Sequence, residues 1–177
     1  TKGEDFIAHV RYPDPYNPRG QIMTLENIDK VKIEGMDVEL SYRPWSFLTV
    51  FANYNYNETR DERTDKILDG YPRNQLSLGA RVRYPFTSDL TLRAYYSARY
   101  IDTYTETTWT RPPVAKEVGD YWWHSVSVGL NWKDMIDLKV SCFNLFNDRT
   151  PIDLGATAVE YIYPPERNYL VEISFKY

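Results

Sequence analysis

The sequence lacks any apolar run that approaches the roughly 20 residues needed for a membrane-spanning helix. Its single cysteine, Cys142, excludes a disulfide within the chain and a cysteine-based metal centre. The net charge of −4 lacks the clustered excess of Lys and Arg that drives nucleic-acid binding. The chain also has only two histidines, His9 and His124. We therefore expect no metal site, no cofactor, no nucleic-acid partner and no enzyme activity.

Aromatic residues, in contrast, are abundant: they make up 16% of the chain, with 16 tyrosines and 5 tryptophans. A soluble core has little use for so many tyrosines, because each buried hydroxyl needs a hydrogen-bond partner. A membrane–water interface suits them, since the ring lies in lipid and the hydroxyl lies among the headgroups. The strands of a barrel expose only every second residue to lipid, so a barrel needs no long apolar run.

Apolar and polar residues alternate over stretches of about ten residues, which predicts β-strands. A phase change in the apolar positions near Gly35 predicts a β-bulge there. The first predicted strand is broken by Pro13 and Pro15. The predicted strands cover roughly residues 6–12, 31–42, 48–56, 76–84, 90–100, 125–132, 138–143 and 169–177.

Short and long connections alternate between these strands. Tight turns are expected at residues 43–46, 85–89 and 133–136, and long polar segments at 57–73, 103–120 and 145–166. Short turns on one side and long loops on the other are the arrangement of outer-membrane barrels, whose short turns are periplasmic. Aromatic residues gather near both ends of the strands, as two interfacial belts would.

A soluble antiparallel sandwich or a lipocalin-like barrel is the alternative interpretation, and it requires a polar outside around an apolar core. Here the face opposite the aromatic residues is charged, which suits a water-filled lumen; its charged residues are Arg81, Arg83, Arg93, Arg99, Lys139 and Glu172. The sequence therefore favours an all-β fold, an antiparallel transmembrane β-barrel segment in contact with the lipid of the bacterial outer membrane.

Several short segments resemble one known family, the TonB-dependent outer-membrane receptors. Residues 35–40 (GMDVEL) are similar to the family's Gly-x-Glu-x-Glu strand, with Asp37 where the family often has Glu. Residues 144–147 (NLFN) resemble its Asn-Leu-Phe-Asp/Asn segment, and residues 164–169 (PPERNY) resemble the lead into its last strand. The Leu-Ser-Leu run after Pro72-Arg73-Asn74 fits as well, so the resemblance covers about residues 28–177.

The resemblance implies about 7–8 strands of a 22-strand barrel whose lumen holds an N-terminal plug domain. Residues 28–177 would be C-terminal transmembrane strands, and residues 1–27 an external loop or the end of a preceding strand. An unclosed sheet leaves unpaired backbone groups in lipid. The remaining strands and the plug are therefore expected from another chain or from a missing segment. The barrel assembly machinery would read the last strand at Tyr169, Val171, Ile173, Phe175 and Tyr177.

The resemblance also implies a function, the TonB-dependent import of a chelated nutrient such as a siderophore–iron or cobalamin-like ligand. Energy would reach the plug through TonB, while this chain supplies barrel wall and external loops. A self-contained eight-stranded barrel with a structural or lipid-acting role is the alternative. A non-transporting segment of a larger surface assembly is a third interpretation.

Candidate binding residues lie in the long loops and on the charged face. The loop candidates combine aromatic rings with an arginine, and a role in the belts or in loop packing is their alternative. They are Tyr104, Trp109, Arg111, Tyr161 and Tyr163. The lumen candidates are expected to contact the plug, with an anionic ligand as the alternative. They are Arg81, Arg83, Arg93 and Arg99.

Two further groups have the residue types of chemical sites. His124 and Ser125 suggest a hydrolase pair, but neighbours on a strand point to opposite faces, so we expect His124 at the lipid interface. An acidic group in the segment 57–73 has oxygen ligands for Ca²⁺. Interleaved Lys and Arg favour a solvated charged loop instead, and the acidic residues are Glu58, Asp61, Glu62, Asp65 and Asp69.

Overall fold

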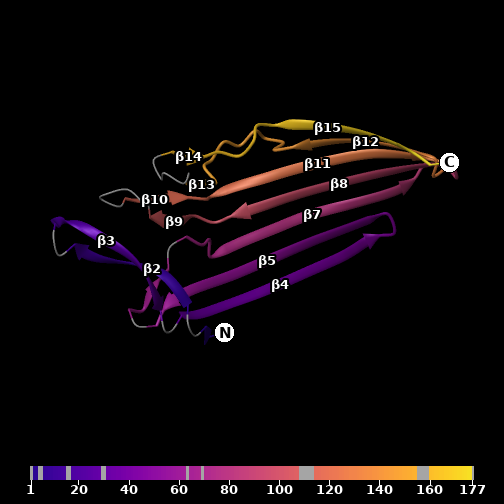
Figure 1. Ribbon diagram of the computed structural model, residues 1–177. Helices are drawn as coiled ribbons and strands as arrows, with labels where there is room; N and C mark the ends of the chain where they lie inside the picture. Colours follow the sequence, from indigo (N-terminus) through magenta and orange to yellow (C-terminus); the bar gives the residue numbers. More distant parts are fainter. Residues whose placement is uncertain are drawn as a thin grey trace.

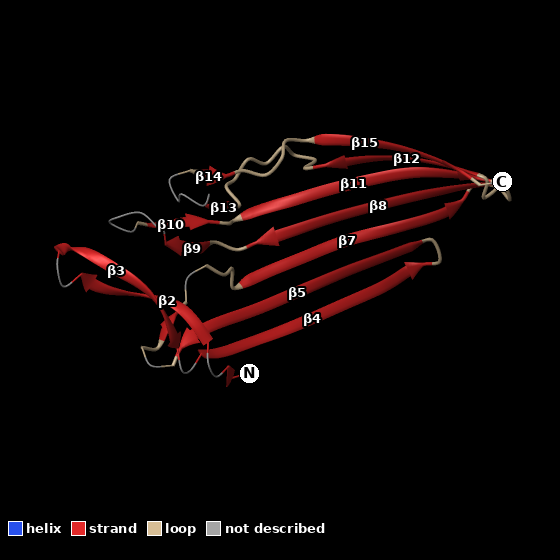
Figure 2. Cartoon of the chain, in the orientation of Figure 1, coloured by secondary structure: helices blue, strands red, loops and turns tan. Residues whose placement is uncertain are grey.

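The computed structural model describes residues 2–3, 6–14, 17–28, 31–62, 64–68, 70–107, 114–154 and 160–176, with side chains from residue 31 onward, Leu154 apart. The regular structure in these ranges is β-strand (Figure 2). None of the described residues belongs to a helix long and apolar enough to cross a membrane.

Most of the chain forms one antiparallel nine-stranded sheet whose long strands are joined in sequence order (Figure 1). Its two short strands lie beside the first two long ones: β1 (Lys2–Gly3) pairs with β4, and β6 (Lys66–Ile67) pairs with β5. The long strands are β4 (Val31–Trp45), β5 (Leu48–Asp61), β7 (Asn74–Pro85), β8 (Leu90–Ile101), β11 (Tyr121–Trp132), β12 (Ile136–Phe143) and β15 (Asn168–Phe175). Each long strand was predicted from the alternation of the sequence.

The sheet does not close on itself within the described residues. β15 pairs with β12 at one edge, while β1 and β4 form the other edge. The predicted N-terminal strand, β2 (Phe6–Asp14), pairs instead with β3 (Asn17–Ile28) in a separate hairpin. A self-contained eight-stranded barrel is therefore wrong, because its closure requires β15 to pair with an N-terminal strand. β2 also continues through Pro13, where a break was predicted, and its register shifts after that residue.

Short turns join the long strands at one end of the sheet, and additional two-stranded hairpins lie at the other end (Figures 1 and 2). The short turns are at residues 46–47, 86–89 and 133–135. The far end carries β2–β3, the pair β9 (Tyr104–Thr107) and β10 (Ala115–Val118), and the pair β13 (Asp153–Leu154) and β14 (Tyr161–Ile162). The predicted long loops thus contain strands of their own, and β5 runs on through Asp61. In outer-membrane barrels the side with long connections is extracellular.

The predicted bulge at Gly35 is wrong. β4 and β5 pair without a shift from Val31↔Asp61 to Tyr42↔Val50, and the register shifts between Tyr42 and Trp45. Proline cannot donate a hydrogen bond to the ladder, so the shift coincides with Pro44. The apolar positions change face because the two ends of β4 have different surroundings. Within the apolar band the apolar residues of β4 are on the outer face, whereas at the extracellular end Val31, on the other face, is only 1% exposed.

The two faces of the main sheet differ in chemistry. One face is an apolar band whose side chains are exposed, with Leu40, Val171 and Ile173 at 63%, 62% and 58% exposure. Such a band is stable only when lipid or another apolar surface covers it. The opposite face is polar along the same strands. On β7 and β8, for example, the cross-strand pairs Ser77↔Arg99 and Arg83↔Arg93 lie on it. This confirms the predicted lipid face and lumen face.

Aromatic side chains form a belt at each end of the apolar band. At the short turns, Trp45 stacks on Phe47 at 5.9 Å between ring centroids, and Phe47 meets Tyr84 edge-on at 5.5 Å. At the extracellular end, the rings of Tyr100 and Trp122 are 5.1 Å apart. Both belts match the predicted positions, and they place the strands between them in the hydrocarbon layer.

Asn144 ties β12 to the lead into β15. It is 1% exposed, and its amide nitrogen donates to the carbonyl oxygens of Asp148 and Pro165, both at 2.9 Å. Its side-chain oxygen accepts from the backbone nitrogen of Asp148 at 2.8 Å. The residue has a φ of +51°, which asparagine tolerates better than most residues. These contacts give a structural reason for the NLFN segment.

We expect Asn144→Leu to destabilise the full-length protein by about 2–4 kcal/mol, because it leaves buried backbone groups without partners and strains the left-handed backbone. The measurement is the denaturant midpoint of the purified protein in detergent. Asn53→Leu is the matched control, because Asn53 is exposed on the lumen face. Equal midpoints for the two variants would contradict this role of Asn144.

Candidate functional site

The extracellular hairpins bring three of the five predicted loop residues together. The hydroxyl of Tyr104, on β9, donates to the carbonyl of Ile152 at 3.2 Å, and the amide of Ile152 donates to the carbonyl of Ile162 at 2.9 Å. Burial, followed by the nearby charge of Glu106, raises the pKa of Tyr104 to about 12. Tyr104 is therefore a neutral packing residue that joins the β9–β10 hairpin to the β13–β14 hairpin.

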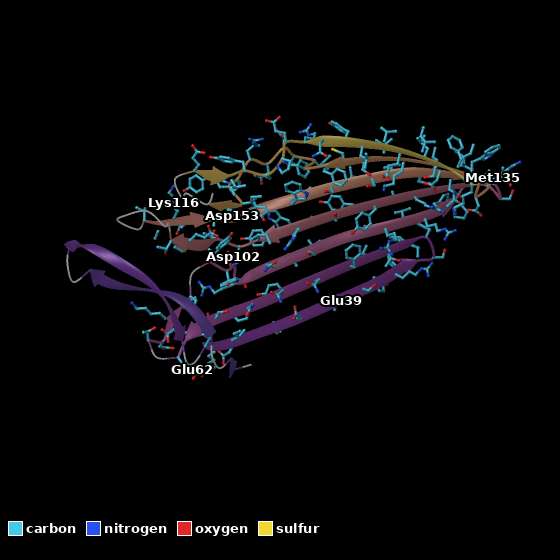
Figure 3. All side chains as sticks on the ribbon, viewed as in Figure 1. Glu39, Glu62, Asp102, Lys116, Met135 and Asp153 are labelled. Carbon is cyan, nitrogen blue, oxygen red and sulfur yellow. The ribbon has the colours of Figure 1, made fainter. Side chains whose placement is uncertain are left out.

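Tyr161 and Tyr163 lie beside this junction, and each carries a cation over its ring. Lys116 Nζ is 4.9 Å from the ring centroid of Tyr161, and Arg149 Cζ is 5.7 Å from that of Tyr163. The two rings are 6.4 Å apart and are 36% and 47% exposed. Figure 3 labels Lys116 at this end of the sheet and Met135 at the opposite end. We call Lys116, Arg149, Tyr161 and Tyr163 the loop cluster.

Sequence reasoning missed Lys116 and Arg149. Lys116 comes close to Tyr161 only because the β9–β10 and β13–β14 hairpins meet, which no periodic pattern in the sequence signals. Arg149 also forms an ion pair with Glu166 at 3.1 Å. The predicted residues Trp109 and Arg111 lie outside the described residues. Their contribution to ligand binding stays a prediction.

The acidic segment is only in part the solvated charged loop that was predicted. The side chain of Asp65 is 87% exposed, and Asp69 lies outside the described residues. Glu58 and Asp61 are each only 7% exposed. Glu58 accepts hydrogen bonds from Arg60 and from the hydroxyl of Tyr56, the latter at 3.1 Å, and lies 3.5 Å from Arg73. Glu58 is thus paired with two arginines, which the interleaved charges in the sequence do not reveal. Within the described ranges, no group of three or more His, Cys, Asp or Glu side chains could hold a metal ion.

We expect acid to weaken this extracellular ion-pair network. The hydrogen bond from Arg60 lowers the pKa of Glu58 below its ordinary value. A carboxyl with a lowered folded pKa stabilises the fold above its unfolded pKa, and this contribution is lost as pH falls through the folded pKa. Glu58→Gln should therefore lose less stability than the wild type between pH 6 and pH 3. Denaturant midpoints of the full-length proteins at the two pH values measure this, and parallel losses would contradict it.

His124 and Ser125 do not form a catalytic pair. His124 lies on the outer face, where its Nδ1 is 2.7 Å from the hydroxyl of Tyr96 and its ring meets Phe146 edge-on at 4.7 Å. Ser125 lies opposite Ser97 in the β8–β11 register, on the lumen face. The structure thus places His124 among aromatic residues of the extracellular belt, as predicted.

The four predicted lumen arginines all lie on the polar face of β7 and β8. Arg93 and Arg99 have partners there, since Arg93 Nη1 is 2.9 Å from Asp137 Oδ2 and Arg99 Nη2 donates to Gln75 Oε1 at 3.1 Å. The Cζ of Arg81 lies 5.9 Å from the ring centroid of Tyr95. A hollow of about 510 Å³ opens on this face between Arg81, Arg83 and Arg93. Contact with a plug remains a proposal.

The last strand presents one apolar row. Tyr169, Val171, Ile173 and Phe175 share the outer face of β15, where all four are more than half exposed. The fifth predicted residue of this row, Tyr177, lies outside the described residues. Recognition of the row by an assembly machinery stays a prediction.

Comparisons with known proteins agree with this fold. The family model described as "TonB dependent receptor-like, beta-barrel" matches residues 1–145. No curated protein matches the chain. Among solved structures, FpvA of P. aeruginosa bound to heterologous pyoverdines is 19% identical with a TM-score of 0.74, over 97% of this chain and 23% of that one.

Two further structures show the same fold. The FpvAI–pyocin S2 complex is 19% identical with a TM-score of 0.75, over 97% of this chain and 22% of that one. The ferric enterobactin receptor PfeA of Pseudomonas aeruginosa, a mutant in complex with enterobactin, is 15% identical with a TM-score of 0.66. It is covered over 27% of its length, so the chain spans about a quarter of the structures that it matches. The chain belongs to the TonB-dependent receptor β-barrel family and is a protein of the bacterial outer membrane.

Proposed function

We propose that this chain supplies barrel wall and extracellular loops to a receptor that imports an iron–siderophore complex. The observation that carries the proposal is the loop cluster, in which two cations and two exposed tyrosine rings meet at the extracellular end of a barrel wall. No catalytic role is proposed, because the family consists of receptors.

The chemistry of the loop cluster suits an anionic ligand with planar groups. Lys116 and Arg149 supply cationic groups, of which Arg149 is also paired with Glu166, while the rings of Tyr161 and Tyr163 supply flat apolar surface. An iron chelate with negatively charged oxygen donors has both properties. The structures of similar fold include receptors bound to pyoverdine and to enterobactin, which supports this ligand class. A cobalamin-like ligand is the second candidate, and Trp109 and Arg111 are proposed to complete the site.

The partners follow from the open edges and the two faces of the sheet. Outer-membrane lipid would cover the apolar band, and further strands, from another chain or another segment, would pair with β4 and β15. A plug domain would lie against the polar face and couple it to TonB. The barrel assembly machinery would act on the row Tyr169, Val171, Ile173, Phe175 and Tyr177.

Growth on defined nutrient sources tests the proposal. A strain that lacks the gene should fail to grow on one ferric siderophore as its only iron source, and a plasmid copy should restore growth. Growth on free iron salts at high concentration is the control, because it bypasses the receptor. Loss of growth on cobalamin alone would assign the second candidate, and unchanged growth on every source would contradict import.

A further inference from the structure

The ion pair between Arg149 and Glu166 lies at the edge of the loop cluster, and it joins the segment after β12 to the lead into β15. Arg149 Nη1 donates to Glu166 Oε1 at 3.1 Å, and the guanidinium carbon lies 5.7 Å from the ring centroid of Tyr163. The side chain of Glu166 is 76% exposed. One of the cations that the loop cluster offers to a ligand is thus already in contact with a carboxylate of the chain itself.

The backbone beside this ion pair is fixed by two asparagines. The side-chain nitrogen of Asn144 donates to the carbonyl of the residue before Arg149 and to the carbonyl of the residue before Glu166, both at 2.9 Å. Asn147 Oδ1 accepts from the backbone nitrogen of the residue that follows Glu166, at 2.9 Å. Both side chains therefore start from fixed backbone positions, and the pair opens or closes by side-chain rotation without any reordering of the loops.

An ion pair of this kind can exchange its carboxylate for another anion. Pairs between exposed side chains contribute little to stability, because water and salt screen both charges. When the pair opens, the ring of Tyr163 still supports the guanidinium of Arg149. Arginine binds anionic oxygens by charge-assisted hydrogen bonds, so a ligand oxygen can take the position of the Glu166 carboxylate. Glu166 competes with every such oxygen, because a tethered group is present at a high effective concentration.

We propose that Glu166 is an internal competitor, which occupies Arg149 in the empty receptor and gives up this place to a negatively charged oxygen of the iron chelate. The inference rests on the proposed function, and it names the ligand group that Arg149 recognises. Glu166 then determines specificity by setting a threshold. A small carboxylate from the medium makes no other contact and is kept off Arg149, whereas an anionic chelate that also covers the rings of Tyr161 and Tyr163 displaces Glu166.

Binding of two iron chelates to the purified full-length receptor tests this exchange. The probes are a ferric tris-catecholate, which is triply negative, and a ferric tris-hydroxamate, which is neutral. Glu166→Gln should tighten the binding of the tris-catecholate about fivefold, because glutamine keeps the size of the side chain but loses the charge that competes for Arg149. The affinity for the tris-hydroxamate should change by less than about twofold, because a neutral chelate does not displace Glu166.

A double-mutant cycle shows whether Glu166 acts through Arg149. Any repulsion between Glu166 and the chelate is common to both backgrounds, but competition requires the arginine. The effect of Glu166→Gln on tris-catecholate binding should therefore be at least about twofold smaller when Arg149 is replaced by glutamine. Asp65→Asn is the matched control, because it also removes a carboxylate from an extracellular ion pair, with Arg60 at 3.4 Å, outside the loop cluster. It should leave both affinities unchanged.

The outcomes separate this inference from the proposed function. Binding of neither chelate would contradict the proposed function itself. The exchange alone is overturned if the tris-catecholate binds equally to the wild type and to Glu166→Gln, or if only the tris-hydroxamate binds. It is also overturned if Glu166→Gln has the same effect with and without Arg149, because Glu166 would then act by general repulsion of anions.

Discussion

Val171→Arg is expected to destabilise the receptor by about 2–4 kcal/mol when the protein is folded into phospholipid vesicles. Val171 is 62% exposed on the outer face of β15, and it continues a cross-strand row through Val140, Val128 and Ala94. This row lies between the two aromatic belts. An arginine there must leave water for hydrocarbon, and no acidic partner is available on that face of the row.

The neighbouring residue provides the matched control. Leu170 is 45% exposed and apolar, but it lies opposite Ser141 on the lumen face. Leu170→Arg should therefore change the stability by less than about 1 kcal/mol, because its guanidinium stays in water. Both values come from denaturant titrations of the full-length variants refolded in vitro, which bypasses the cellular assembly machinery. Equal losses for the two variants would contradict the assignment of the faces.

Gly119→Ala is expected to lower the affinity for the imported chelate at least about tenfold, or 1.4 kcal/mol. Gly119 has a φ of +98°, and an added Cβ would lie 2.2 Å from the carbonyl oxygen of Asp102. Backbone cannot move aside as a flexible side chain can. The β9–β10 hairpin would therefore shift and carry Lys116 away from Tyr161.

Gly70→Ala is the matched control, because it introduces the strain of a positive φ without the clash that is expected at Gly119. Gly70 has a similar φ of +95°, but nothing lies within 4 Å of its added Cβ. Its amide also donates to Thr105 on β9, so both glycines support the same hairpin. Quenching of tryptophan fluorescence by the ferric chelate measures the affinity of each full-length variant. An affinity of Gly119→Ala equal to that of Gly70→Ala would contradict the geometry of the loop cluster.

The strands and the faces could be predicted because the environment is periodic. Successive side chains along each strand face lipid and lumen in turn. An apolar residue such as Val171 is therefore expected on the lipid face, and a charged residue such as Glu172 on the lumen face. The same reasoning failed at Gly35, where the apolar positions change face without an extra residue. Above the membrane the outer face is no longer apolar, and Val31 is buried on the other side. A change of environment along a regular strand therefore produces the same phase change in the sequence as a bulge.

The site was less predictable because it depends on contacts between distant loops. Tyr161 and Tyr163 could be identified as exposed aromatic residues in a long connection. Their cations come from β10 and from the segment after β12, and sequence spacing does not bring these together. The burial of Glu58 was missed for a similar reason, since its partner Arg73 is supplied by the approach to β7.

Uptake of radioactive iron as the ferric siderophore tests the central claim most directly. Cells that carry the complete receptor should accumulate the label, and cells that lack either the receptor or a working TonB should lose this accumulation. The same cells should take up free ferrous iron normally, as the control. Uptake that continues unchanged without the receptor, or that is independent of TonB, would contradict the assignment of this chain to an energised import receptor.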